Sequence, residues 1–134
     1  MIAVDSSVVV AAFSSWHEHH SEAVRVFDRE PRMIAHVAFE TYSVLTRLPP
    51  PHRADPALVL TFLEEGFPAS FLLLPVGEQR RLLATCSRLG LTGGATYDAL
   101  IAATALRAGA SLVSLDRRAL PTYRAVGVGF ELLA

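Results

Sequence analysis

The chain has 134 residues, of which 51% are hydrophobic and 19% charged, a composition typical of folded globular proteins and unlike that of a disordered chain. This length corresponds to one domain, so we expect residues 1–134 to form a single domain. The formal net charge of −1 gives no overall positive field for binding nucleic acid, although a bound divalent cation would change the sign of an acidic site.

Several residue types are missing or rare. All basic residues are Arg, and the absence of Lys excludes lysine-dependent phosphate loops and Schiff-base chemistry. Cys86 is the only cysteine and cannot form an internal disulfide, which suits a reducing cytosol. Asp5 interrupts the first apolar run before a secretory signal could form, and no apolar stretch reaches the roughly 18 residues of a membrane span. We therefore expect a cytoplasmic protein without membrane contacts.

Apolar runs without polar alternation predict strands, and capped or amphipathic segments predict helices. In chain order the predicted elements are strand 2–5, helices 8–13 and 17–29, strand 32–35, helices 37–48 and 56–65, strand 71–74, helices 78–89 and 96–108, and strands 111–115 and 126–132. Because the strands alternate with helices and are apolar throughout, we expect an α/β fold. Its predicted form is a three-layer α/β/α sandwich with a mostly parallel five-stranded sheet.

Acidic residues occupy special places in this arrangement. Asp5 and Asp116 follow predicted strands, and open α/β sheets bind ligands beyond the carboxyl ends of their strands. Glu40 lies on the apolar face of its predicted helix, one turn from Val37 and Val44. A carboxylate on a buried face is unfavourable unless it is paired, protonated or bound to a metal.

Asp98 is the fourth such acid, in the first turn of a predicted helix that is apolar almost all round. For any one of these acids alone, capping of a turn or helix, or pairing with an Arg, is the simpler explanation. Four acids at strand ends and buried helix faces, with no Lys to neutralise them, indicate a bound cation. Carboxylates without supporting thiolates favour Mg²⁺ or Mn²⁺ over Zn²⁺.

Segments 1–7, 39–40, 97–105 and 112–118 carry these acids. With their order along the chain, they resemble the PIN-domain family, specifically the VapC-type toxin ribonucleases of bacterial toxin–antitoxin pairs. The resemblance covers essentially the whole chain. It implies a parallel sheet flanked by helices and an endoribonuclease that depends on Mg²⁺, with Mn²⁺ able to substitute. It further implies an RNA substrate, a homodimer, and a cognate VapB-type antitoxin that blocks the site.

The resemblance also assigns roles to residues. The catalytic and metal-binding acidic quartet falls on Asp5, Glu40, Asp98 and Asp116. Ser6 and Ser114 fall where the family commonly has a Ser or Thr that supports the carboxylates, with Thr the commoner residue at 114. Some members have a further acid just after the last Asp, where this chain has Arg117 and Arg118. We therefore expect one firmly held Mg²⁺ and a second that binds weakly or only with substrate.

Other polar clusters have simpler interpretations. The segment 16–20 contains three His residues but lacks the two-His spacing of the zincin motif. It is more readily a solvated helix or a rim facing the substrate than a metal site. Arg117, Arg118 and Arg124 follow the last acid of the quartet and are candidates for contacts with RNA phosphates. For Tyr97, beside Asp98, packing is favoured over stacking on a base.

Two other functions remain open at this stage. A phosphoacceptor or phosphatase-like domain could use Asp5, but the haloacid-dehalogenase pattern needs a second acid two residues later, where this chain has Ser7. A response-regulator pocket needs a Lys, which the chain lacks. The second alternative is a PIN-like module that binds RNA or protein without cutting. Such members typically have an incomplete quartet, whereas all four acids are present here.

Overall fold

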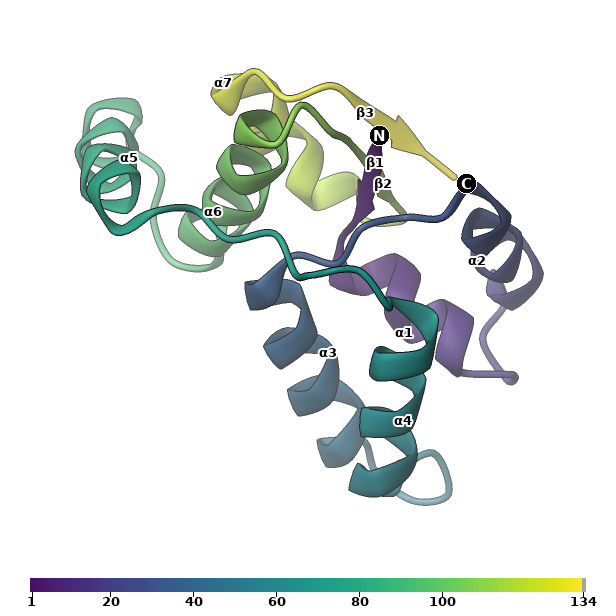
Figure 1. Cartoon of the computed structure of the whole chain (residues 1–134). Coiled ribbons are helices and arrows are strands. Elements are labelled where there is room, and N and C mark those ends of the chain that lie inside the picture. The colour runs from purple at the N-terminus through teal and green to yellow at the C-terminus, as the bar shows by residue number, and fades with distance from the viewer. Residues whose placement is uncertain (134) are drawn as a thin grey trace.

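The computed structural model describes residues 1–133 (Figure 1). Three parallel strands form its sheet, in the order β1 (Ile2–Val4), β2 (Ser111–Ser114) and β3 (Phe130–Leu132). The register places Val4 of β1 beside Val113 of β2, so the two strands end at the same edge of the sheet. The α/β class and the parallel sheet are thus confirmed.

The prediction of five strands is wrong, because the segments 32–35 and 71–74 make only isolated bridges. Ala3 bridges to Arg32, and Ile34 bridges to Leu72, both in the parallel sense. These segments therefore extend the sheet beyond β1 without becoming strands. Prolines explain their shortness: Pro31 lacks an N–H at one end of the first segment, and Pro75 closes the second.

Six predicted helices are present, with ends shifted by no more than three residues from the predicted ones. They are α1 (Ser6–Phe13), α2 (His20–Val26), α3 (Ala35–Arg47), α4 (Pro56–Gly66), α5 (Val76–Leu89) and α6 (Gly94–Arg107). A 3₁₀ turn, η1 (Phe27–Arg29), completes the predicted 17–29 helix. Within residues 1–133, no helix has the length and apolar character needed to cross a membrane.

One helix was not predicted. A 3₁₀ turn, η2 (Arg117–Ala119), leads into α7 (Leu120–Val126), so the expected strand 126–132 is shortened to β3. Pro121 stands in the first turn of α7, and Gly127 ends the helix with a left-handed φ of 95°. Proline in the first turn and glycine just after the end are typical helix boundaries, so the signal was present in the sequence.

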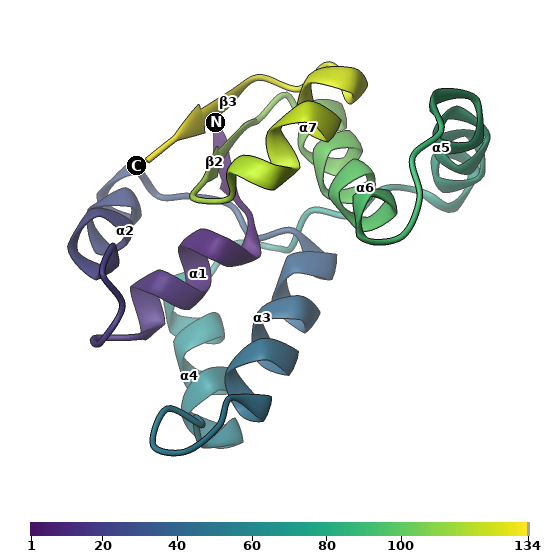
Figure 2. The same ribbon diagram turned by 180° about the vertical axis from the view of Figure 1, so that it is seen from behind.

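Helices cover both sides of the sheet. The views from opposite sides show α1 to α4 on one side and α6 and α7 on the other, with α5 beyond α6 (Figures 1 and 2). Fully buried side chains such as Val8 of α1, Ile101 of α6 and Leu112 of β2 fill the space between these layers. Because α1 begins directly after β1, and η2 directly after β2, the carboxyl edge of the sheet is where side chains from several elements meet.

Candidate active site

Asp5 lies at the carboxyl end of β1 with only 3% of its surface exposed. It caps α1, because the Ser7 N–H donates to its Oδ1 at 3.1 Å. The Ser7 hydroxyl donates to the same oxygen, and the Tyr123 hydroxyl of α7 donates to Oδ2 at 2.7 Å. Both carboxylate oxygens are therefore fixed in orientation by donors from the helices on either side of the sheet.

Ser7 joins the first strand end to the second. Its Oγ accepts from the Leu115 N–H at 2.8 Å while donating to Asp5. Ser114, fully buried at the end of β2, accepts from the Asp116 N–H at 2.9 Å and hydrogen-bonds to Asp5. The supporting role that the resemblance gave to Ser114 is thus compatible with these contacts. The spacing of Ser7 two residues after Asp5 could have predicted its contact with the Asp5 carboxylate, whereas no local pattern indicated the contact of Tyr123.

Glu40 and Asp98 approach the strand ends from α3 and α6. Glu40 lies one turn after His36, whose Nε2 is 3.3 Å from the Glu40 carboxylate. The His36 ring also stacks on Tyr97, the neighbour of Asp98, with the ring centroids 5.1 Å apart and the planes within 6°. Helix α6 begins at Gly94, two residues before its expected cap, so Asp98 lies in the second turn and not in the first.

The negative charges of the other three acids act on Asp98. Partial burial and the negative charges of Asp116, Glu40 and Asp5 raise the pKa of Asp98 to about 6. The nearby Arg118 guanidinium lowers it only in part. Carboxylates from two strand ends and from α3 are therefore near enough to Asp98 of α6 to repel its negative charge.

Burial changes the ionisation of two more groups. Desolvation raises the pKa of Asp5, opposed by hydrogen bonds from Ser114, Ser7 and Tyr123. The pKa of Tyr123 is also raised, first by burial and then by the charge of Asp5 and the hydrogen bond to it. Tyr123 consequently remains a protonated donor to Asp5 at neutral pH.

The predicted RNA-contacting arginines are not equivalent. Arg118 is exposed, lies 3.6 Å from Asp116 and lines one hollow together with it. Arg117 is exposed on η2. The Arg124 guanidinium lies over the Phe130 ring, 5.2 Å from its centroid, and so packs against β3. Ser6 lines the hollow beside Arg118, and Arg118 is thus the arginine that the structure brings to the acids.

The donor set fits a hydrated, hard divalent cation. Within residues 1–133, no three Asp, Glu, His or Cys side chains stand close enough together to form a complete metal cage. Mg²⁺ does not need one, because it is commonly held by one or two carboxylates and keeps several waters. The raised pKa of Asp98 records repulsion that such a cation would relieve.

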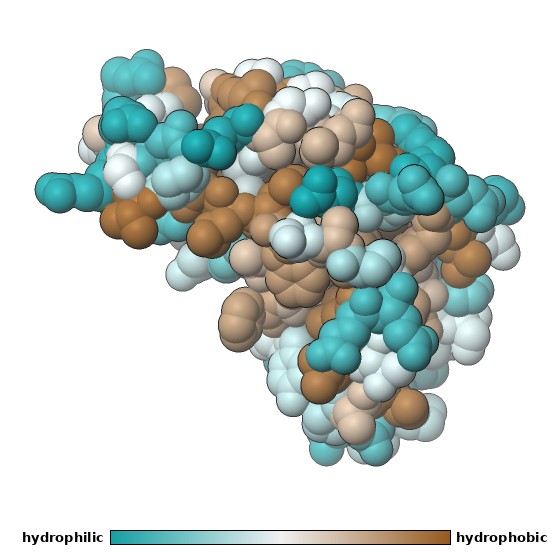
Figure 3. Space-filling view, in the orientation of Figure 1, coloured by the Kyte–Doolittle hydropathy of each residue, from teal (hydrophilic) through white to brown (hydrophobic). Residues whose placement is uncertain are grey.

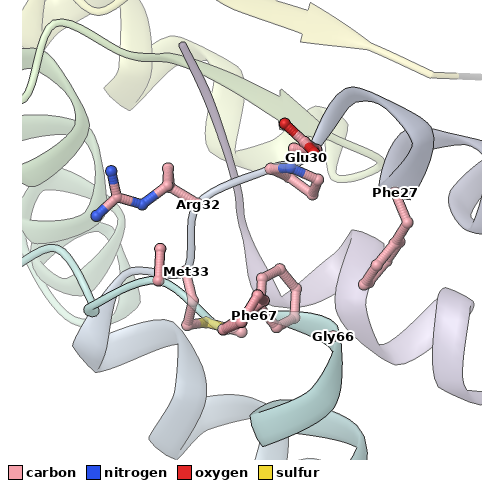
Figure 4. A pocket seen from close by; sticks show the side chains of 9 residues that line it. Phe27, Glu30, Arg32, Met33, Gly66 and Phe67 are labelled. Carbon is pink, nitrogen blue, oxygen red and sulfur yellow. The ribbon is translucent and has the colours of Figure 1, made fainter.

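A separate hollow lies between η1 and the end of α4. Phe27, Met33, Gly66 and Phe67 line it, together with Arg32 (Figure 4). None of the four carboxylates is among its lining residues. This hollow is therefore distinct from the acidic site at the carboxyl edge of the sheet.

A parallel α/β sheet with four converging carboxylates beyond its strand ends defines a class of acidic, cation-binding domains. The PIN-domain family model matches residues 2–125. Ribonuclease VapC40 of Mycobacterium tuberculosis, in strain CDC 1551 / Oshkosh and in strain H37Rv, is 49% identical over 133 residues, 99% of both chains. Ribonuclease VapC27 of strain H37Rv is 39% identical over 128 residues, 95% of this chain and 93% of that protein. The chain belongs to the PIN-domain family, within its VapC-type ribonucleases.

Proposed function

We propose that this protein is a metal-dependent endoribonuclease that hydrolyses RNA phosphodiester bonds through Asp5, Glu40, Asp98 and Asp116. It acts as the toxin of a VapBC-type pair, with residues 1–134 as a single ribonuclease domain. The convergence of four carboxylates on one space, recorded in the raised pKa of Asp98, is the observation that carries the proposal. The relatives named as ribonucleases support the choice of substrate.

The chain's own residues prepare the site for a phosphodiester. Ser7 and Tyr123 hold the Asp5 carboxylate from opposite sides, so its position is set before substrate arrives. Arg118 is almost fully exposed beside Asp116 and is available to contact a backbone phosphate. The carboxylates of Glu40 and Asp98 face the same space from the helices.

A bound cation fits this set, and Mg²⁺ is our proposed choice, with Mn²⁺ able to substitute. The ligands would be Asp98, Asp116 and Glu40, with Asp5 contributing the lone pairs that its protein donors leave free. When bound, such an ion activates water and stabilises the leaving oxygen of an in-line displacement. Arg117 and Arg118 occupy the place of a further acid, which supports one firmly held ion.

The experiment that tests the proposal compares RNA ends in cells expressing wild type or Asp98→Asn. Wild type should arrest growth and create new RNA ends at defined sites, and Asp98→Asn should do neither. Asp55→Asn is the matched control, because Asp55 is an exposed cap of α4 that Asn can replace. New ends of equal abundance in Asp98→Asn would refute the assigned quartet.

A partner protein and a second copy complete the proposal. We propose a cognate VapB-type antitoxin and a homodimer, and exposed apolar side chains support the latter. Figure 3 shows hydrophobic residues on the face carrying α3, α4 and α5. The exposed apolar side chains of α3, α4, α5 and the segment before α5 include Phe39, Leu60, Leu83 and Leu73, which are 52% to 78% exposed. Leu73→Glu with Leu83→Glu should lower the molar mass in light scattering towards one chain, and an unchanged mass would exclude this face.

The alternative is a PIN-like module that binds RNA or protein without cleavage. It is less well supported, because such modules commonly lose part of the quartet and this chain has all four acids. Stoichiometric Mg²⁺ binding in calorimetry, with no cleavage across total RNA, would favour it. Loss of cleavage in Asp98→Asn, with metal present, would favour the nuclease.

A further inference from the structure

A groove leads away from the acidic site along α1 and α3. Its lining includes Asp116, which follows β2, and His17 and His19 of the loop after the end of α1. Val10 of α1 and Val44 of α3 contribute apolar lining. Helix α1 has eight residues and is therefore about 12 Å long, which corresponds to roughly three stacked nucleotides.

A line of ring side chains continues from the groove to the surface, and we call it the aromatic row: His19, His17, Trp16 and His52. The centroids of His19 and His17 are 5.9 Å apart, as are those of His17 and Trp16. Trp16 stacks on His52 of the loop after α3, with a centroid separation of 4.1 Å and an interplanar angle of 30°. Trp16 is 48% exposed and His52 is also exposed, so this end of the row is open to solvent, while His17 and His19 are half-buried.

Hydrogen bonds hold the two loops that carry the row. The His17 N–H donates to the Ser14 carbonyl at 3.0 Å, and the His19 N–H donates to His17 Nδ1 at 3.0 Å. In the other loop, the His52 N–H donates to the Pro49 carbonyl at 3.0 Å. The segment expected to begin a helix at 17 is thus a hydrogen-bonded turn, and the rings are positioned before any ligand binds.

The charges beside the row favour bases over phosphates. Glu18 and Glu22 flank His19, with side-chain distances of 3.6 and 3.0 Å. Glu18 is 83% exposed and would repel a phosphate placed at this end of the groove. Ring faces, in contrast, bind unpaired bases by stacking, with little dependence on base identity.

We propose that the aromatic row binds unpaired bases of a single-stranded RNA segment, a few nucleotides from the bond that is cut. The proposal rests on the proposed ribonuclease function and adds a base-binding subsite to it. Arg118 then contacts the backbone beside the carboxylates, while Trp16 and His52 stack on bases beyond the far end of α1.

Trp16 is the only tryptophan of the chain, so its fluorescence reports directly on the row. The assay uses the Asp98→Asn protein with Mg²⁺, so that binding is measured without cleavage. A short single-stranded oligoribonucleotide should quench Trp16 fluorescence, and an abasic ribose-phosphate chain of the same length should not. Equal quenching by both chains, or quenching by neither, would overturn the proposal.

Variants in the same background give a second measurement, the anisotropy of the labelled oligoribonucleotide. Trp16→Ala should weaken binding roughly 5- to 100-fold, and Trp16→Phe should retain most of the affinity because it keeps a ring. Phe71→Ala is the matched control, since it removes a ring of similar exposure on a different surface. Unchanged affinity in a folded Trp16→Ala protein would exclude RNA from the row and leave a protein segment as its occupant.

Failure of this proposal is distinguishable from failure of the ribonuclease assignment. If wild type cuts RNA and the oligoribonucleotide leaves Trp16 fluorescence unchanged, the aromatic row is not the base site but the nuclease stands. The opposite case is quenching of Trp16 by the oligoribonucleotide but not by the abasic chain, together with no RNA cleavage by wild type. The row would then bind bases in a protein that is not a nuclease.

Discussion

Replacing Asp98 by Asn should stabilise the metal-free protein at alkaline pH. The surroundings raise the pKa of Asp98 from 3.8 to about 6, which corresponds to about 3 kcal/mol of unfavourable ionisation in the folded state. Asp98 is only partly buried, so solvent screens part of this penalty and roughly 1 to 2 kcal/mol remains. Asn keeps the shape and removes the charge, and the free energy of unfolding should rise by that amount.

The sign of the pH dependence follows from the raised pKa. Below pH 3.8 the carboxyl is protonated in both the folded and unfolded states, so it costs nothing. The penalty develops as the pH rises from about 3.8 to about 6, and it is complete well before pH 8. The stability advantage of Asp98→Asn over wild type should therefore grow from acidic pH to pH 8.

Urea unfolding at pH 5 and pH 8, with chelator present, measures this difference. Asp55→Asn is the control for an Asp-to-Asn change, because Asp55 is exposed and only caps α4 through the Ala57 N–H. Its stability relative to wild type should be the same at both pH values. Two results would refute the idea that the four carboxylates repel one another. One is an Asp98→Asn variant less stable than wild type at pH 8; the other is a stability advantage of this variant that does not grow with pH.

Three further predictions follow from the same contacts. Ser7→Ala removes the hydroxyl donor to Asp5 and leaves the Leu115 N–H without its acceptor. The free energy of unfolding should therefore fall by about 1 to 3 kcal/mol in urea titrations, and a change near zero would count against this link. Leu45→Ala creates a cavity at a fully buried position and should cost about 2 to 5 kcal/mol by the same assay, whereas a negligible loss would mean the core relaxes around it. Mg²⁺ at about 100 times its dissociation constant should stabilise wild type by about 2.7 kcal/mol in calorimetry and Asp98→Asn by much less; equal stabilisation would place the ion elsewhere.

The placement of the four acids was predictable because they lie at strand ends and on helices that the sequence marks clearly. Asp5 and Asp116 come directly after apolar runs, and such runs in an alternating α/β chain must end at one edge of a parallel sheet. Glu40 and Asp98 lie among apolar residues of α3 and α6, so helical periodicity predicted that both side chains would be partly buried. Their mutual repulsion is the structural result of that placement.

Other features depended on contacts between distant segments. Tyr123 reaches Asp5 across 118 positions of the chain, and no local pattern specifies such a contact. The strand count was wrong because hydrophobic runs show where a segment is buried but not how many bridges it makes. Helix α7 was missed although Pro121 and Gly127 marked its ends, since the apolar residues after it were assigned to a strand. The stacking of Trp16 on His52 likewise brings together two loops that no local sequence pattern pairs.

The most direct test of the central claim is cleavage of RNA by the purified chain with and without a divalent cation. Wild type should cut single-stranded RNA with Mg²⁺ or Mn²⁺ and stop when chelator is added, and Asp98→Asn and Asp5→Ala should remain folded and inactive. The proposed site uses all four carboxylates, so replacing any one of them should abolish cleavage. Cleavage that persists in chelator, or in either variant, would contradict the assignment of Asp5, Glu40, Asp98 and Asp116 as the active site.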